Sequence, residues 1–353
     1  MISVSNLEKS YGDRVLFADA SFQLNPGERY GIVGANGSGK TTLLNILSGD
    51  AQPTDGTVAV GKSLRLGVLR QDQFIHGDEE VLGVALMGHP ELWKAMVEKD
   101  ALLARAHEHF DADRYSVLEE TVQRLDGYTA EARAATILEG LGLPAEVHRR
   151  PLSTLSGGFK LRVLLAQVLA GSPDVLLLDE PTNHLDNDAR DWLLKYMRAY
   201  RGALIVISHD LELLDEAITR VLHLDRHGES DIGELIEYKG TYSQYHAARR
   251  KDEERLAKQA VAQAKEVDRL QRVVDRFGAS ATKAAMAHSI EKRIQRIEAN
   301  GVTAQTKRRE LRLRFPEPPA SGRTVLEVEG LAKSYGALDV FDDVSFDVGR
   351  GER

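Results

Sequence analysis

The stretch "GIVGANGSGKTTLL", residues 31–44, decides the fold. Residues 34–41 fit the pattern G-x-x-x-x-G-K-[ST], in which a glycine-rich loop turns backbone N–H groups toward phosphates. The preceding "YGIVG" predicts a short buried strand. The following "KTTLLNILSG" predicts a helix that Gly49 ends. Because the pattern requires this strand–loop–helix context, the sequence predicts a nucleotide-phosphate site.

The polar residues of this loop have expected partners in such a site. Lys40 can reach the β- and γ-phosphates, and the Thr41 hydroxyl can ligate Mg²⁺. The start of the helix adds its positive dipole end. ATP and Mg²⁺ are therefore the expected cofactors. The expected nucleotide ligands from the loop are Gly34, Asn36, Gly37, Ser38, Gly39, Lys40, Thr41 and Thr42.

An acidic pair ends the apolar run "VLLLDEP" at residues 175–181. Asp179 would hold Mg²⁺ through water, and Glu180 would polarise the attacking water. Such a pair alone is often only a helix cap. With the glycine loop upstream, the catalytic interpretation is favoured.

Strand and helix patterns alternate over the first two thirds of the chain and predict an α/β core. The apolar runs "DVLLLDEP" and "GALIVISHD" are typical of central parallel strands. Residues 1–24 alternate apolar and polar residues and predict two or three antiparallel strands. From about Val81 to Leu143 the periodicity is helical. The expected fold is α/β with an antiparallel β subdomain and a helical insert.

Composition narrows the class of protein. The chain has 353 residues, 42% of them hydrophobic, and a net charge of −8, which suits two or three domains. It has no cysteine, which excludes disulfides and thiolate metal sites. No stretch approaches the ~18 apolar residues that span a bilayer, and the first residues lack a signal-peptide layout. We expect a cytoplasmic protein without a membrane span.

Residues 241–314 have a different character, with no strand pattern. Apolar residues at 4-3-4-3 spacing from Leu256 to Phe277, and again from Ile290 to Ile297, predict two antiparallel helices with a turn near Gly278. From Lys239 to Arg314 there are 19 Lys/Arg and 9 Asp/Glu, a net charge of +10 against −18 for the rest. This asymmetry indicates a polyanionic partner, although charge alone fits a solvated helical face as well.

The start of the chain recurs near its end. Residues 2–29 align without gaps with residues 326–353, and 13 of the 28 positions are identical. A duplicated domain therefore begins there. Because about 30 residues are too few for an independent fold, we expect the chain to be part of a longer protein.

Three further motifs stand in order along the chain: "LSGG" at 155–158, "NHLD" at 183–186 and "SHD" at 208–210. With the glycine loop and "LLLDE", they resemble the motif set of ATP-binding cassette (ABC) ATPases over about residues 1–240. The resemblance implies an ABC-type P-loop nucleotide-binding domain that hydrolyses ATP.

The resemblance also implies roles for single residues. The catalytic residues would be Glu180, His209, which would contact the γ-phosphate, and Gln71. Mg²⁺ would be held by Thr41, Gln71 and Asp179, partly through water. Gln73 competes with Gln71 for its role. Tyr11 would stack on adenine, unless it is a core tyrosine at a strand edge.

In this family one nucleotide lies between the glycine loop of one cassette and the "SGG" of another. Ser156, Gly157 and Gly158 would serve the opposite cassette's nucleotide, and Asp186 would communicate across the pair. Hydrolysis would then need a second cassette or a head-to-tail homodimer. We expect the isolated chain to bind ATP and to hydrolyse it poorly.

The layout resembles the short-arm subgroup of the ABC-F family, soluble tandem-cassette ATPases that act on the ribosome. The resemblance implies a first cassette at 1–238 with an arm at 88–128, an α-helical hairpin linker at 239–318 and the start of a second cassette at 324–353. The implied partners are the 23S rRNA and the P-site tRNA near the peptidyl-transferase region. The candidate RNA contacts are Arg249, Arg250, Lys251, Arg272, Arg276, Lys283, Lys292, Arg293 and Arg296.

Two other classes of function remain open. The ATPase subunit of an ABC transporter would use the same motifs, but the basic hairpin has no obvious role there. A DNA-handling ABC ATPase would bind duplex DNA through the same basic helices. Excision-repair types use zinc modules, which the absence of cysteine excludes. Chromosome-maintenance types have a long coiled coil between the glycine loop and "LSGG", and no such pattern stands there in this sequence.

Overall fold

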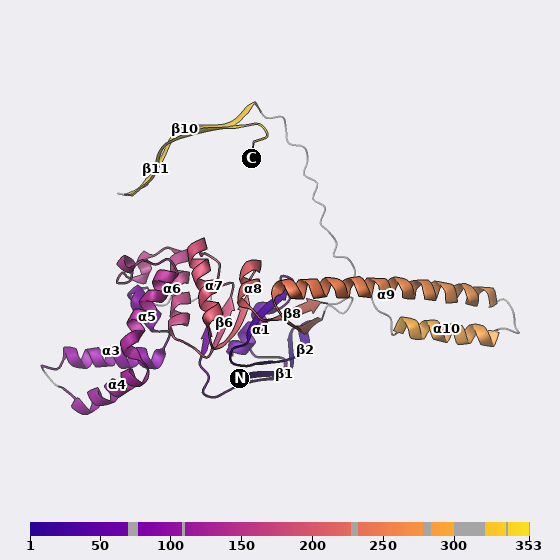
Figure 1. Ribbon diagram of the computed structural model, residues 1–353, viewed down its shortest axis with the longest axis horizontal. Helices are drawn as coiled ribbons and strands as arrows, with labels where there is room; N and C mark the ends of the chain where they lie inside the picture. The colour runs from indigo at the N-terminus through magenta and orange to yellow at the C-terminus, as the bar shows by residue number, and fades with distance from the viewer. Residues whose placement is uncertain are drawn as a thin grey trace. The chain divides into compact units, whose positions relative to one another are not determined.

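A computed structural model describes residues 1–69, 77–107, 110–226, 232–277, 284–299, 322–336 and 338–352. The chain divides into two compact units, Met1–Gln305 and Thr306–Arg353. The first unit carries the glycine loop, and the second carries the repeat of the N-terminal residues (Figure 1).

The first unit is built on a nine-stranded sheet with the order β4-β1-β2-β9-β8-β3-β7-β6-β5. Its strands are β1 (Ile2–Tyr11), β2 (Arg14–Leu24), β3 (Arg29–Gly34), β4 (Asp55–Val60), β5 (Leu66–Val68), β6 (Val175–Asp179), β7 (Ala203–Ile207), β8 (Arg220–Arg226) and β9 (Gly233–Lys239). Strands β8, β3, β7, β6 and β5 are parallel, whereas β4, β1 and β2 form an antiparallel edge. The predicted α/β class with an antiparallel subdomain is confirmed.

This strand order positions the functional motifs. The glycine loop follows β3 and the acidic pair follows β6, and β7 lies between these two strands. The carboxyl ends of parallel strands meet at one edge of a sheet, where α/β proteins bind their ligands. The motifs at residues 34–41, 179–180 and 208–210 therefore share one edge.

The central strands are apolar throughout because helices cover both faces of the sheet. All five residues of β6 are buried. Val175 and Leu177 belong to the same core as the buried leucines of α1 (Lys40–Ser48). Leu176 and Leu178 belong to a second core with residues of the helices on the other face. Truncating one such leucine to alanine costs about 2–5 kcal/mol.

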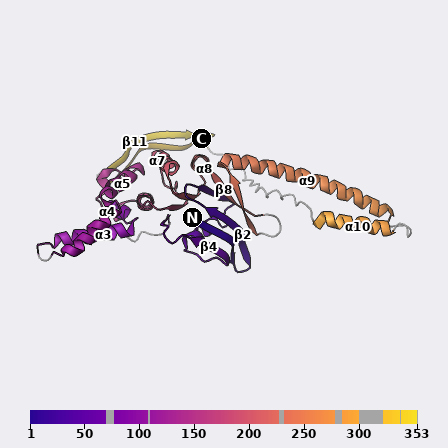
Figure 2. The same ribbon diagram turned by 60° about the horizontal axis from the view of Figure 1, so that its bottom comes forward.

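Seven helices lie between β5 and β8 in the described chain, together with strands β6 and β7. They are α2 (Val81–Leu86), α3 (Pro90–Ala104), α4 (Ala112–Arg124), α5 (Gly127–Gly140), α6 (Gly157–Ala170), α7 (Asn187–Ala199) and α8 (Leu211–Ala217), with 3-10 turns at Ala145–Val147 and Leu152–Thr154. Helices α3 and α4 lie side by side in Figures 1 and 2 and pack through Leu92, Leu118 and Val122. They account for most of the insert predicted at 88–128.

The basic segment forms two long helices, α9 (Tyr242–Phe277) and α10 (Ala284–Ala299), which lie side by side in both views (Figures 1 and 2). Leu270, Val274 and Ile294 are buried between them. The Gln263 amide donates to the Ile297 carbonyl oxygen at 2.6 Å, which fixes an antiparallel register. The apolar stripes predicted this pairing correctly, and the turn predicted near Gly278 lies outside the described residues.

The second unit contains an antiparallel hairpin of β10 (Thr324–Tyr335) and β11 (Leu338–Gly349). It reproduces the β1–β2 register: Val4 pairs with Phe22, and Val328 with Phe346. The backbone copies its irregularities too, since Asp19 has φ 52° and its counterpart Asp343 has φ 51°.

The environments of the two hairpins differ. Leu7, Phe17 and Phe22 are buried, whereas their counterparts are exposed, with Leu331 at 46%, Phe341 at 39% and Phe346 at 46%. The repeat thus has the same backbone without the same core. Its assignment to a second cassette, and the domain boundaries given above, remain predictions.

Candidate nucleotide site

The glycine loop owes its shape to backbone angles that other residues rarely adopt. Gly37 has φ 73° and Gly39 has φ 104°. A Cβ atom on Gly39 would lie 3.2 Å from the Phe17 ring, so the loop also packs closely on β2. Lys40 begins α1, and its Nζ donates to the carbonyl oxygens of Gly34 and Ala35 at 3.1 and 3.2 Å. The ammonium group is therefore held over the loop.

Oxygen donors suited to Mg²⁺ meet where α1 and β6 approach each other. The Thr41 hydroxyl donates to Asp179 Oδ2 at 2.7 Å. The Ser38 side chain, also in the loop, is buried, and its Oγ has no hydrogen-bond partner among the described residues. A hydroxyl and a carboxylate are hard ligands of the kind that Mg²⁺ takes together with substrate phosphates. The residues predicted for the metal therefore fit it.

No larger metal cluster competes with this assignment. Within the described ranges there is no group of three or more His, Cys, Asp or Glu that could hold a metal ion. Of the predicted magnesium ligands the structure describes Thr41 and Asp179, and phosphate oxygens and water commonly complete such a site. Gln71, the third predicted ligand, and its competitor Gln73 lie outside the described residues.

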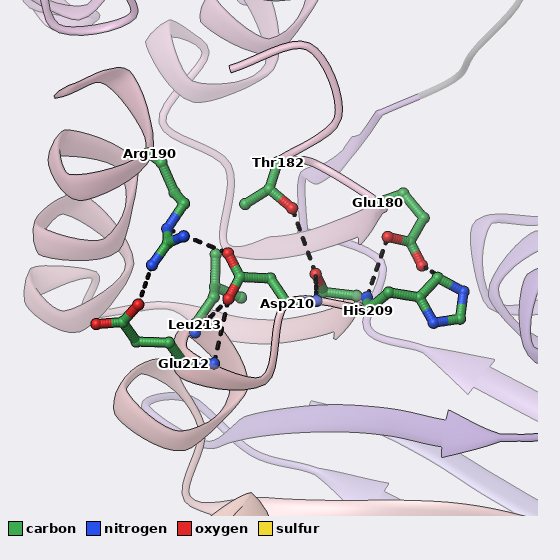
Figure 3. A network of polar contacts seen from close by, with 8 residues as sticks. Glu180, Thr182, Arg190, His209, Asp210, Glu212 and Leu213 are labelled. Atoms are coloured by element: carbon green, nitrogen blue, oxygen red, sulfur yellow. Dashed lines mark hydrogen bonds and ion pairs between the residues drawn. The ribbon is translucent and has the colours of Figure 1, made fainter. Parts of the chain in front are cut away.

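The predicted catalytic pair is adjacent at the end of β6 and β7 (Figure 3). Glu180 Oε2 accepts the backbone N–H of His209 at 3.2 Å, and His209 Nε2 lies 3.5 Å from Glu180 Oε1. The glutamate side chain is 14% exposed and the histidine side chain 70%. A shielded carboxylate beside an exposed imidazole can orient water toward a group that enters from solvent.

A polar network supports this edge and was not predicted from the sequence. Asp210 accepts the backbone N–H groups of Glu212 and Leu213 and so caps α8. Arg190, from α7, contacts Asp210 at 3.2 Å and also pairs with Glu212 (Figure 3). Asp210, the residue after His209, is therefore held in place by contacts with α7 and α8.

Comparisons with known proteins agree with this geometry. Two family models, both described as ABC transporter, match residues 17–183 and 229–315. The chain is 39% identical to "Probable ATP-binding protein YbiT" of Escherichia coli O157:H7, over 100% of the chain and 66% of that protein. It is 27% identical to "ABC transporter F family member 5" of Arabidopsis thaliana, over 100% of the chain and 51% of that protein.

The chain belongs to the ABC-F type of ATP-binding cassette proteins. It spans about half to two thirds of the length of these curated relatives. A solved ATP-binding subunit of an ABC transporter shares the fold, at 18% identity and TM-score 0.51, over 69% of this chain and 91% of that one. Among the described helices of this ABC-F chain, none combines the length and apolarity needed to cross a membrane.

The "LSGG" motif of residues 155–158 lies at the start of α6. Ser156 is the N-cap residue of the helix and its side chain makes no capping hydrogen bond. Ser156 and Gly157 are exposed, and a Cβ atom on Gly157 would meet nothing within 4 Å. Asp186 caps α7 by accepting the Ala189 N–H at 3.0 Å. Each of these residues therefore stands at an accessible helix start.

Tyr11 ends β1 and is 58% exposed, with Lys9 Nζ 4.8 Å above its ring. The alternative of a core tyrosine is therefore wrong. Adenine stacking stays a prediction. Asn36 is exposed on the loop, and Thr42 is half-buried in α1.

The candidate RNA contacts divide into two groups. Arg249 is anchored to the cassette: it contacts Asp225 of β8 at 3.1 Å, Glu253 at 2.7 Å and the Tyr245 hydroxyl at 3.1 Å, and it also contacts His223. These partners and its half-buried side chain anchor it to β8 and to its own helix, and its role as an RNA contact stays a prediction. The exposed cations are Arg250, Lys251, Arg272, Arg276, Lys292, Arg293 and Arg296. Lys283 lies outside the described residues.

Proposed function

We propose that this chain binds MgATP at the glycine loop and that Glu180 activates the water that attacks the γ-phosphate. The observation that carries the proposal is the convergence of Lys40, the Thr41–Asp179 pair and the Glu180–His209 pair on one edge of the sheet. Mg²⁺ would supply charge neutralisation at the phosphates. Glu180 would accept the water proton, and His209 would contact the γ-phosphate beside Glu180.

Hydrolysis by this site is proposed to need a second cassette. The accessible start of α6 supports this, because a helix N-terminus with small residues suits a phosphate presented by another surface. That second cassette would come from a longer chain that includes β10 and β11, or from a second copy of this chain.

We further propose that the cassette pair acts on the ribosome in the cytoplasm and that its closure moves the α9–α10 hairpin against tRNA or rRNA. The exposed arginines and lysines of α9 and α10 support this part. RNA contacts of this kind are strongly salt-dependent, because each neutralised phosphate releases counterions.

The test is ribosome pelleting with the Glu180→Gln variant, in ATP and in ADP. Slow hydrolysis should hold the closed state, so the variant should pellet with ribosomes in ATP and not in ADP. A Lys40→Ala version of the same variant is the control and should stay in the supernatant. The absence of pelleting in ATP would contradict the ribosome proposal, and membrane or duplex-DNA binding would then favour the transporter or DNA reading.

A further inference from the structure

Arg162, in the second turn of α6, connects this helix with Leu141 and with the His184–Asp186 turn. Its Nε donates to the His184 carbonyl oxygen at 2.9 Å. Its Nη1 donates to the Leu141 carbonyl oxygen at 3.1 Å and to Asp186 Oδ2 at 2.8 Å. The side chain is only 9% exposed, so these contacts are made in a largely water-free environment.

The surroundings of this guanidinium are built to receive it. Gly142 has φ 78°, and a Cβ atom there would lie 2.6 Å from Arg162 Nη1. A side chain at position 142 would therefore be strained and would also displace the arginine. On the other side, the guanidinium carbon lies 4.9 Å from the centre of the Phe159 ring. Phe159 is 40% exposed and stands in the first turn of α6, beside Ser156 and Gly157.

The contact with Asp186 is electrostatically significant as well. The Ala189 backbone N–H, and then the Arg162 side chain, hold the pKa of Asp186 below its usual range. The carboxylate is thus charged at neutral pH while it both caps α7 and receives Arg162. Its Oδ1 accepts the Ala189 N–H, and its Oδ2 accepts the hydrogen bond from Arg162.

We propose that Arg162 is a positioning residue that locks the start of α6 to the His184–Asp186 turn, so that the two surfaces offered to an opposing cassette move as one body. The inference rests on the proposed pairing of cassettes. Without Arg162, the start of α6 and the His184–Asp186 turn would each open locally more often and would lose their fixed mutual position. An opposing cassette would need both surfaces in place at the same time. The ATPase rate would therefore fall, whereas the affinity of the glycine loop for nucleotide would stay unchanged.

An arginine is required for this role by geometry. Three acceptors lie in different directions around one planar group, and its face rests on an aromatic ring. A lysine keeps the charge but has a single nitrogen, so it cannot reach all three acceptors. Compared with Arg162→Gln, the Arg162→Lys variant should therefore recover more of the folding stability than of the fixed position between the start of α6 and the His184–Asp186 turn.

The direct test is amide hydrogen exchange of the 353-residue chain, comparing wild type with Arg162→Gln and Arg162→Lys. Exchange should accelerate in residues 160–163 of α6 and in residues 185–189 together, by about fivefold or more, as expected for the loss of buried hydrogen bonds. Acceleration in only one of the two segments would overturn the proposal, because the residue would then be a local support.

The functional readout is the ATPase rate and the affinity for a fluorescent ATP analogue. In Arg162→Gln the rate per chain should fall about 10- to 100-fold, with analogue affinity within about twofold of wild type. The matched control is Arg220→Gln, since Arg220 is likewise an arginine with more than one acceptor, the carboxylates of Glu28 and Glu237, but lies on β8. If the control lowers the rate as much at the same loss of thermal stability, Arg162 has only a structural role.

These readouts separate failure of the inference from failure of the proposed function. If the wild-type chain hydrolyses no ATP in any paired form, the proposed function fails, and the exchange data alone decide the positioning role. If the wild type hydrolyses ATP and Arg162→Gln does so equally well, the inference fails and the proposed function stands.

Discussion

Glu180 has an unusual backbone for a residue with a side chain, with φ 49°. Its N–H donates to the Ile207 carbonyl oxygen at 2.8 Å, which ties the end of β6 to β7. A left-handed conformation at a non-glycine residue costs about 1–3 kcal/mol and is kept only where neighbouring contacts fix it. Here those contacts direct the carboxylate at the His209 amide, so a local strain places the proposed base.

Glu180→Gln should separate binding from chemistry. The amide keeps the size of the side chain but cannot accept a proton, so we expect the ATPase rate to fall about 100-fold or more, with ATP binding preserved. Rate and nucleotide affinity measured on the same preparation check this. An unchanged rate would remove Glu180 from the mechanism.

Lys40→Ala should abolish tight nucleotide binding without unfolding the cassette. The ammonium lies over the loop, and losing a charge-assisted hydrogen bond to phosphate should weaken binding about 10- to 100-fold. Titration with a fluorescent ATP analogue measures the effect. Lys94→Ala is the matched control, because Lys94 is an exposed lysine on α3, away from the loop.

Single residues were predictable from the sequence where a motif fixes them on one strand or loop. Lys40, Asp179 and Glu180 follow strands whose apolar runs are unmistakable, and parallel strand ends must meet. Arg162 and Arg190 were not predictable, because their partners are carbonyl oxygens and carboxylates brought near only by tertiary packing. The exposed or anchored state of Arg249 and Arg250 was equally hidden, since the two are adjacent in sequence.

At the scale of elements, α8 connects the catalytic edge with the linker. Its first turn is capped by Asp210, next to His209. Its Asp215 receives the backbone N–H of Ser243 at 2.6 Å and the Ser243 hydroxyl at 2.5 Å, at the start of α9. This short helix is thus capped next to His209 at its start and contacts the base of the α9–α10 hairpin through Asp215.

Arg249→Ala should loosen the base of α9. It removes a partner of the buried Asp225, and we expect a loss of about 2–4 kcal/mol of folding free energy. Urea unfolding of the chain measures it. The neighbouring Arg250→Ala is the control and should change stability little, because its side chain is 72% exposed and lies 3.9 Å from Glu254. Equal effects from both variants would contradict the anchoring role.

The Asp215–Ser243 contact should give a pH signature. Hydrogen bonds from the Ser243 side chain and backbone lower the pKa of Asp215 in the folded chain. A lowered pKa means that the contact stabilises the fold above the usual aspartate pKa of about 3.9 and is lost as pH falls below it.

Comparison with Asp215→Asn tests this assignment, since asparagine does not titrate. The difference in unfolding free energy between wild type and variant should be constant from about pH 7 to pH 5 and should shrink toward pH 3. A difference that grows on acidification would have the wrong sign and would exclude the assignment.

At the scale of the whole molecule, the proposed pairing makes activity depend on protein concentration. If copies of the chain pair, the ATPase rate per chain should rise with concentration, and Glu180→Gln with ATP should increase the fraction with twice the mass. Light scattering after size-exclusion chromatography measures that fraction, with Lys40→Ala as the control. A rate per chain independent of concentration would mean that one cassette suffices.

The large-scale plan was predictable because it follows from patterns repeated over many residues. The α/β core, the helical insert, the antiparallel hairpin and the repeat all follow from periodicity or self-alignment. The nine-stranded order was not predictable, since β9 pairs not only with β8, which precedes it directly, but also with β2, across more than 200 residues of sequence. No local pattern encodes such a distant neighbour.

The hairpin of β10 and β11 has a consequence for handling the protein. A lone two-stranded hairpin is marginally stable in water, and among the described strands this one has no partner at either edge, with exposed apolar side chains such as Val340 at 53% and Phe346 at 46%. Unpaired edges of this kind are templates for strands of other molecules. If the 353-residue chain is handled without a surface that covers this hairpin, we expect it to aggregate as it is concentrated, and a lysine placed on the hairpin's edge should reduce the aggregation.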